Sequence, residues 1–379
     1  METKLLNGTN KEAIAEASKI LQNGGLVAFP TETVYGLGAD ALNADAAAKI
    51  YAAKGRPSDN PLIVHIADTD AVEKLADLET MNRTHPDMVK KAHMLMEAFW
   101  PGPLTIIFPK LAIVPDGTTG GLPTVAIRMP SHPIAQELIR TSGVSIAAPS
   151  ANTSGRPSPT TAQHVWEDMD GRIEMILDGG AVGIGIESTI VDMTGTIPTI
   201  LRPGFITKAM LSEIVGDVTI DPAIIEPDPN LRPKAPGMKY THYAPHGTLS
   251  IVEAAADESA NRASLHSGVK VSYNATEAET LRVAEKIKAL VNEKESQGYK
   301  VAILTTKEHA SLYKNYSHVL IVGEGSKGQT ISARLYAALR ECDSEQMEYM
   351  YSEAFDQNEL GGAIMNRLLK AAGHRVITV

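Results

Sequence analysis

Cysteine is almost missing from this sequence. Cys342 is its one thiol among 379 residues. One thiol forms no intrachain disulfide and supplies no set of paired ligands for a cysteine-based zinc site. A chain of this kind suits a reducing compartment, so we expect a cytoplasmic location.

Long apolar runs are missing too. No stretch reaches the eighteen apolar residues that predict a transmembrane helix, so we expect no membrane span. The first residues, METKLLNGTNKE, are polar and include acidic groups. They do not resemble a secretory signal peptide.

Several signatures of ligand sites are also absent. The chain has no G-x-x-x-x-G-K-[ST] phosphate loop, and its glycine-rich stretches GGAVGIGIES and VGEGSKGQ do not fit a dinucleotide fingerprint. No His, Asp and Glu set has metal-ligand spacing. We therefore predict no metal site on the protein, and expect any Mg²⁺ to be carried on the phosphates of a substrate.

The composition is typical of a globular protein with more acidic than basic residues. Hydrophobic residues make up 43% and charged residues 21%, and the net charge is −10. The length predicts two or three domains with real cores. The negative charge argues against a protein that coats nucleic acid, although it leaves room for one local basic cleft.

Helix and strand patterns alternate through residues 1–215, which predicts an α/β domain with a mixed sheet. Asn10 and Asn43 are expected N-caps, and short β-branched stretches such as LVAF, PLIVHI, LTIIF and TVAIRM are expected strands. Residues 216–247 are rich in proline, which predicts an extended linker. The linker contains the stretch KAPGMKYTHYAP near its end. Residues 248–379 repeat a strand–helix pattern, which predicts a smaller, Rossmann-like unit with a parallel sheet.

Polar residues gather where strands of the first domain end, the edge at which open α/β sheets bind ligands. The stretch AKGRPSDNPLIVH places Lys54 and Arg56 around Gly55, followed by Asn60. Two cations and an amide suit a polyphosphate, whereas the alternative is a solvated helix end. The stretch APSANTSGRPSPT adds hydroxyl groups around a glycine; alone, it is equally compatible with an ordinary polar loop.

Two arginines close strands in the same domain. Arg128 ends TVAIR and Arg202 ends TILR. A guanidinium projecting from a strand usually has a carboxylate or phosphate partner. His65, at the end of PLIVH, taken alone is better explained as a core histidine.

Four segments in order, PTETVYGLG, KGRPSDNPLIVH, APSANTSGRPSPT and ESTIVD, resemble the YrdC-domain family of threonylcarbamoyl-AMP synthases over residues 10–205. The linker and the second unit resemble the two-domain members of that family. The resemblance implies a twisted YrdC-type mixed sheet in residues 1–215, a lid over the active site in residues 216–247, and a Rossmann-like domain in residues 248–379.

The resemblance also implies an activity: synthesis of L-threonylcarbamoyladenylate and pyrophosphate from L-threonine, bicarbonate or CO₂, and ATP. The product would serve a threonylcarbamoyl transferase complex that modifies tRNA next to the anticodon. Lys54 and Arg56 are the implied catalytic cations. The implied threonine site is Thr33, His65, Arg128, Ala148 and Ser188. The implied ATP site is Arg56, Asn60, Thr124, Ser150, Ser158, Arg202 and Tyr243. Ala148 has no polar side chain, so its contact must come from the main chain.

Two other functions remain to be weighed. YrdC-type domains are associated with double-stranded RNA, so a binding module without catalysis is the alternative, and weak RNA binding is left open; the acidic charge counts against it. A carbamoyl transferase of hydrogenase maturation is a second alternative, but those proteins carry zinc fingers that one cysteine does not build. The sequence does not assign a role to residues 248–379.

Overall fold

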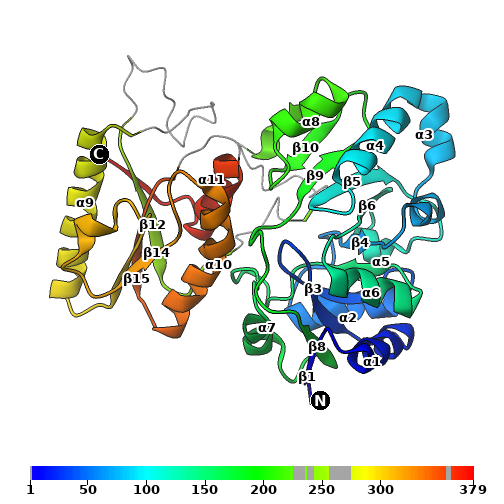
Figure 1. The fold of residues 1–379 in the computed structure, drawn as a ribbon, viewed down its shortest axis with the longest axis horizontal. Helices are drawn as coiled ribbons and strands as arrows, with labels where there is room; N and C mark the ends of the chain where they lie inside the picture. The colour runs from blue at the N-terminus through cyan, green and yellow to red at the C-terminus, as the bar shows by residue number, and fades with distance from the viewer. Residues whose placement is uncertain (1, 225–234, 237–242, 256–274, 356–359) are drawn as a thin grey trace. The chain divides into compact units, whose positions relative to one another are not determined.

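The computed structural model describes residues 2–224, 235–236, 243–255, 275–355 and 360–379. The chain divides into two compact units, Met1–Ser154 with Ser158–Tyr240, and Gly155–Pro157 with Thr241–Val379. Both units are α/β, which confirms the predicted fold class (Figure 1). Residues 225–234 and 237–242 of the expected linker lie outside the described residues. So does the stretch VKVSY, whose β-branched residues predict a strand. The lid therefore stays a prediction.

The first unit contains a sheet of eleven strands in the described part of the chain. Its strands are β1 (Lys4–Asn7), β2 (Val27–Pro30), β3 (Tyr35–Asp40), β4 (Ile63–His65), β5 (Leu104–Pro109), β6 (Thr124–Arg128), β7 (Ile146–Ala148), β8 (Met175–Asp178), β9 (Thr189–Asp192), β10 (Thr199–Arg202) and β11 (Thr219–Ile220). Its helices are α1 (Lys11–Gln22), α2 (Ala44–Lys54), α3 (Leu78–Thr84), α4 (Pro86–Phe99), α5 (Asp116–Thr119), α6 (Pro133–Ser142), α7 (Ala162–Met169) and α8 (Lys208–Val215).

The strand order is β1-β8-β2-β3-β7-β4-β6-β5-β9-β10-β11, and the sheet contains both parallel and antiparallel pairs. The pairing brings three strand ends to one edge. Arg128 at the end of β6 is in register with His65 on β4 and with Thr105 on β5. Thr189, which begins β9, is in register with Leu104 on β5. The mixed sheet predicted from sequence is therefore confirmed, and its pairing builds the site described below.

Hydrophobic side chains cover the sheet on both faces. Along β2, Val27 and Phe29 enter the core that α1 and α6 cover, whereas Ala28 enters the core that α2 and α4 cover. This alternation is the two-residue period of a strand buried on both sides. Both predicted caps are present: the Asn10 side chain accepts from Glu12 N at 2.7 Å, and that of Asn43 accepts from Asp45 N at 3.1 Å.

Among its described residues, the second unit contains a parallel sheet of five strands in the order β14-β13-β15-β12-β16, as the repeated strand–helix pattern predicts. Helix α9 covers one face, and α10 and α11 cover the other (Figure 1). The strands are β12 (Thr248–Glu253), β13 (Val301–Thr305), β14 (Val319–Ile321), β15 (Tyr349–Glu353) and β16 (Val376–Thr378). The helices are α9 (Glu277–Ser296), α10 (Gly328–Ser344) and α11 (Leu360–Ala371).

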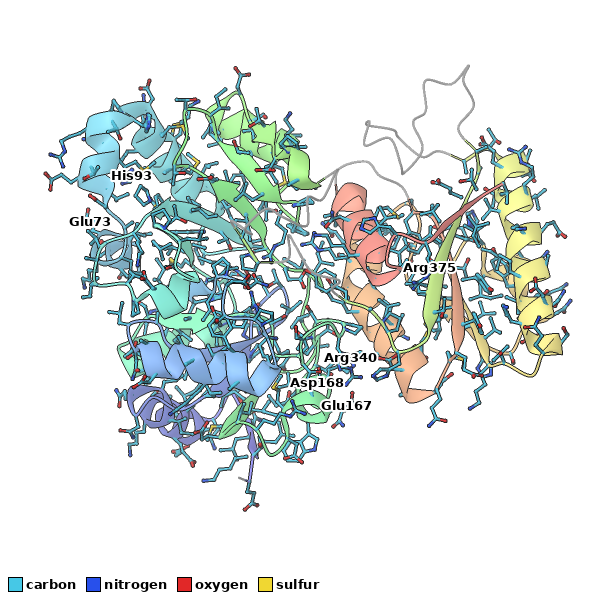
Figure 2. The ribbon with its side chains drawn as sticks, turned by 180° about the vertical axis from the view of Figure 1, so that it is seen from behind. Glu73, His93, Glu167, Asp168, Arg340 and Arg375 are labelled. Atoms are coloured by element: carbon cyan, nitrogen blue, oxygen red, sulfur yellow. The ribbon has the colours of Figure 1, made fainter. Side chains whose placement is uncertain are left out.

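Three residues of the APSANTSGRPSPT segment, Gly155–Pro157, belong to the second unit by their contacts. Arg340 on α10, labelled in Figure 2, donates from Nε and Nη2 to Pro157 O at 3.1 and 2.7 Å. Arg156 forms an ion pair with Asp343 at 3.4 Å. No helix in the described part of the chain combines the length and the apolarity needed to cross a bilayer.

Candidate active site

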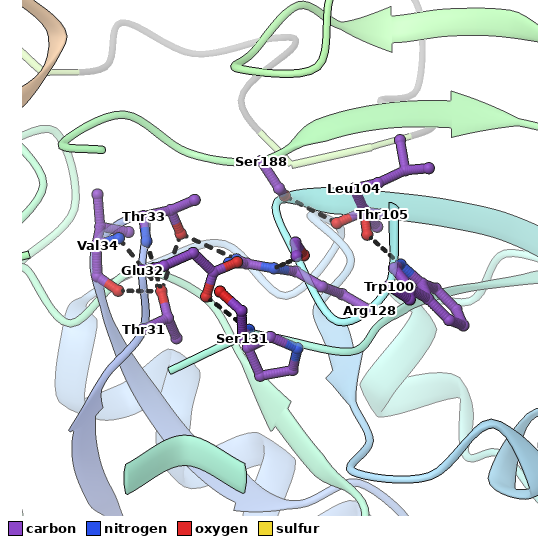
Figure 3. Close-up of polar contacts among 12 residues, drawn as sticks. Thr31, Glu32, Thr33, Val34, Trp100, Leu104, Thr105, Arg128, Ser131 and Ser188 are labelled. Carbon is purple, nitrogen blue, oxygen red and sulfur yellow. Dashed lines mark hydrogen bonds and ion pairs between the residues drawn. The ribbon is translucent and has the colours of Figure 1, made fainter. Parts of the chain in front are cut away.

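Arg128 is the centre of the candidate site. It ends β6 and is only 4% exposed, so its positive charge needs partners inside the protein. Nη1 donates to Thr33 Oγ1 at 3.0 Å, Nη2 forms an ion pair with Glu32 Oε1 at 2.5 Å, and Nε donates to Gly102 O at 3.3 Å (Figure 3). The guanidinium is therefore fixed by two loops that are distant from it in sequence.

The loop that holds Arg128 is the turn between β2 and β3. Thr31 Oγ1 lies 2.9 Å from Thr33 Oγ1 and donates to Val34 O at 2.7 Å, which closes the turn on itself. The carbonyl groups of Glu32 and Thr33 accept hydrogen bonds from Ile184 N and Gly185 N at 2.9 and 3.0 Å. The PTET segment is thus tied to the segment that leads into Glu187 and Ser188.

His65 lies beside Arg128 in the sheet and is 4% exposed. Its Nδ1 is 3.1 Å from Ile63 O, and its ring meets Phe29 edge-on at 6.1 Å. Burial, followed by the charge of Arg128, lowers the pKa of His65 to about 3. The imidazole is therefore neutral at physiological pH and offers a hydrogen bond without a charge.

Arg202 and Ser188 form the neighbouring part of the site. Arg202 is 6% exposed and donates from Nε to Ser188 O at 3.0 Å and from Nη2 to Ser188 Oγ at 3.1 Å. Ser188 Oγ also lies 2.8 Å from Thr105 Oγ1. Gly204 allows this close packing, because a Cβ there would lie 2.5 Å from Thr189 N. Thr105 pairs with Arg128 in the register of β5 and β6. The hydroxyl pair of Thr105 and Ser188 therefore adjoins the strand position of Arg128 and also contacts Arg202 through Ser188.

Lys54 holds the APSAN segment. Its ammonium donates to Ser150 O and Asn152 O, both at 2.5 Å, and the residue is 4% exposed. Ser150 Oγ in turn donates to Asn152 Oδ1 at 2.5 Å. Gly55 ends α2 in the left-handed conformation with φ 62°, which turns the chain between the two cations. The predicted catalytic Lys54 therefore also supports a predicted ATP-binding loop.

Arg56, Asn60 and Thr124 belong to the ATP site predicted from the sequence. Arg56 donates to Pro61 O at 3.1 Å, and its guanidinium lies 6.0 Å from the centre of the Tyr51 ring. Asn60 is 1% exposed, and its Oδ1 accepts no hydrogen bond from the described residues. Because buried acceptors are normally hydrogen-bonded, this oxygen is a candidate to accept a hydrogen bond from a ligand. Thr124 begins β6, about 13 Å along the strand from Arg128 at the usual rise.

Three further predicted residues complete the set. Ala148 ends β7 opposite Ile63 on β4, where its main chain takes part in the sheet. Ser158 is fully buried and donates to Glu187 Oε1 at 2.6 Å. Tyr243 belongs to the second unit, where it stacks on Tyr336 with ring centres 5.1 Å apart.

Sequence reasoning missed two carboxylates, Glu32 and Glu187. Both lie inside segments that it singled out, PTET and ESTIVD, and each contacts a predicted site residue. Each could have been found as an acidic residue within a motif that is otherwise expected to bind anions. Across the described residues, no group of three or more His, Cys, Asp or Glu side chains is arranged to hold a metal ion.

Comparisons with known proteins match the whole chain. Residues 19–204 match a family model described as telomere recombination (Sua5, YciO and YrdC), and residues 206–373 match one described as the threonylcarbamoyl-AMP synthase C-terminal domain. The threonylcarbamoyl-AMP synthase of Bacillus subtilis is 46% identical over 97% of this chain and 95% of its own length. That of Pyrococcus abyssi is 41% identical over 96% and 95%.

A solved structure gives the same result. The P. abyssi Sua5 crystal structure in complex with L-threonine matches with a TM-score of 0.84 and 40% identity, and the match covers 100% of both chains.

The buried histidine predicts a pH dependence of stability. Unfolded His65 takes up a proton near pH 6.5, whereas folded His65 does so only at about pH 3. The unfolded chain therefore binds more protons in this window, and lowering the pH favours unfolding. From pH 7 to pH 5, we expect wild-type protein to lose up to about 2 kcal/mol more unfolding free energy than His65→Asn.

Urea unfolding at the two pH values measures this difference. His93→Asn is the matched control, because His93 lies exposed on α4 (Figure 2). It should lose the same unfolding free energy as wild type. Equal losses in wild type and His65→Asn would contradict a buried, neutral histidine.

Proposed function

The chain belongs to the threonylcarbamoyl-AMP synthase family, and on that premise we propose that it makes L-threonylcarbamoyladenylate. The substrates are L-threonine, bicarbonate or CO₂, and ATP, and the second product is pyrophosphate. The adenylate is an activated mixed anhydride, which a threonylcarbamoyl transferase complex consumes to modify tRNA beside the anticodon. A cytoplasmic location fits such a partner.

One observation carries the proposal: two cations, Arg128 and Arg202, are buried at strand ends. Arg202 donates to the Ser188 hydroxyl group, which lies 2.8 Å from that of Thr105, the register partner of Arg128. The threonine carboxylate, the carbamate formed on its amine and the triphosphate of ATP are all negative groups that repel one another. Fixed cations away from bulk water stabilise such groups strongly, because the site does not reorganise as charge develops.

The reaction needs positioning more than it needs a nucleophile. The neutral threonine amine adds to CO₂ with loss of a proton, or to bicarbonate with loss of water, to form a carbamate. A carbamate oxygen then attacks the α-phosphorus of ATP as pyrophosphate leaves. The attacking atom belongs to the substrate, so catalysis consists of alignment and charge stabilisation. We assign Arg128 to the threonine carboxylate, with Thr33, Ser188, neutral His65 and the main chain of Ala148 around the amino acid.

We assign Arg56, Asn60 and Lys54 to the binding of ATP. Arg56 contacts the phosphates, and the buried Oδ1 of Asn60 accepts a hydrogen bond from the nucleotide. Lys54 adds positive charge while it holds the 150–152 loop. The other nucleotide contacts are Thr124, Ser150, Ser158, Arg202 and Tyr243. Mg²⁺ enters on the ATP phosphates as part of the substrate.

RNA binding without catalysis is less well supported at this site. A surface that follows a phosphate backbone needs accessible cations. Lys54, Arg128 and Arg202 are each at most 6% exposed, so they serve small anions better than a polymer.

The first prediction concerns the reaction and Arg128. With ATP and bicarbonate, we expect pyrophosphate release that depends on L-threonine, with threonylcarbamoyl-AMP identified by mass. Arg128→Ala should lower kcat/KM about 100- to 1000-fold, the usual cost of one charge-stabilising donor. Arg83→Ala, which removes an exposed arginine from α3, is the control and should keep full activity. No adenylate under any condition, together with salt-dependent RNA binding, would contradict the proposal.

The second prediction separates the two substrates. Lys54→Ala removes the donor to Ser150 O and Asn152 O, on the ATP side of the site. We expect turnover to fall at least tenfold and the KM for ATP to rise, while calorimetric affinity for L-threonine changes less than threefold. Lys49→Ala removes an exposed lysine from the same helix, α2, and is the control. It should keep the turnover and the KM for ATP of wild type. Full activity of Lys54→Ala would remove Lys54 from the mechanism.

A further inference from the structure

Glu32 contributes a fixed negative charge directly beside Arg128. Its Oε1 is 2.5 Å from Arg128 Nη2, and its Oε2 accepts from Ser131 N at 3.0 Å (Figure 3). The Glu32 side chain is 14% exposed and that of Arg128 is 4% exposed. The carboxylate is thus held from two sides, while part of it stays accessible.

Both members of the ion pair retain capacity for a ligand. A guanidinium has five N–H donors, and the contacts of Arg128 with described residues use three of them. A carboxylate has about four acceptor sites, and those contacts of Glu32 use two. A ligand that brings one anionic and one cationic group can therefore add to the pair without breaking it.

The electrostatics of the pair select between ligands. A simple carboxylate placed on Arg128 is attracted by the guanidinium and repelled by Glu32, and the two effects largely cancel at similar distances. An α-amino acid carries an ammonium group two bonds from its carboxyl carbon. Its carboxylate reaches Arg128 and its ammonium reaches Glu32, so both interactions are favourable.

We propose that Glu32 is a specificity-determining residue that binds the α-ammonium group of the substrate, while Arg128 binds the carboxylate. The Glu32–Arg128 pair therefore admits α-amino acids and disfavours carboxylates that lack the amine. This inference rests on the proposed function, which makes L-threonine the ligand.

The test compares two ligands by calorimetry. L-threonine and (R)-3-hydroxybutyrate share the carboxylate and the hydroxyl group, but only threonine has the amine. In Glu32→Gln, we expect threonine to bind about 10- to 100-fold more weakly, as for loss of a hydrogen bond to a charged group. Hydroxybutyrate should bind as well as before or better, because a repulsive charge is gone.

Two variants control for trivial effects. Glu32→Asp keeps the charge and should restore part of the preference for threonine. Glu16→Gln removes a carboxylate from a different ion pair, in which Glu16 on α1 lies 2.5 Å from Lys4 on β1. This variant should bind both ligands like wild type. Thermal melting and ATP affinity report whether each variant is folded.

Three outcomes are decisive. A fall in the ratio of threonine to hydroxybutyrate affinity supports the assignment. Unchanged threonine affinity in Glu32→Gln, or an equal loss for both ligands, overturns it and leaves Glu32 as a support for Arg128. If wild-type protein binds no threonine, the proposed function itself fails and this assignment falls with it.

Discussion

The site depends on one constraint: a buried positive charge must be paired where it lies. An unpaired buried ion costs several kcal/mol. Arg128, Arg202 and Lys54 meet this demand with partners from three different loops, the Thr31–Thr33 turn, the Ser188 segment and the Ser150–Asn152 segment. The partners are the Glu32 carboxylate, two hydroxyl groups and backbone carbonyl groups, all in segments that adjoin strands. Pairing the charges therefore also fixes the loops that surround the substrates.

The pairing has a consequence for the chemistry. The register of β4, β5, β6 and β9 places Thr105 opposite Arg128 and brings the Ser188 segment to β5, where Arg202 contacts the Ser188 hydroxyl group. His65 and Arg128 are neighbours in this arrangement. Burial and the adjacent cation favour the uncharged form of the His65 imidazole. The site thus offers strong charge only at selected points. Such an arrangement suits a reaction in which substrate atoms act on one another and the protein aligns them.

Much of this could be predicted from the sequence, because the signals were local. The Asn10 and Asn43 caps, the short β-branched strands and the parallel second sheet follow from neighbouring residues. Tyr35–Asp40 forms strand β3, although its sequence, YGLGAD, contains no β-branched residue that would predict a strand. The Glu32–Arg128 pair joins residues 96 positions apart, and only the strand order brings them together. For the same reason, sequence alone did not show that Lys54 donates to the loop at Ser150.

The central claim is that Arg128 receives the carboxylate of the substrate. A crystal structure of this protein with L-threonine bound tests it most directly. The account predicts carboxylate oxygens at about 2.7–2.9 Å from the Arg128 guanidinium, the distance of a charge-assisted hydrogen bond. The ion pair between Arg128 and Glu32 should remain in place. A threonine carboxylate bound to Arg202 or Arg56 instead, with Arg128 engaged only by protein groups, would contradict the account.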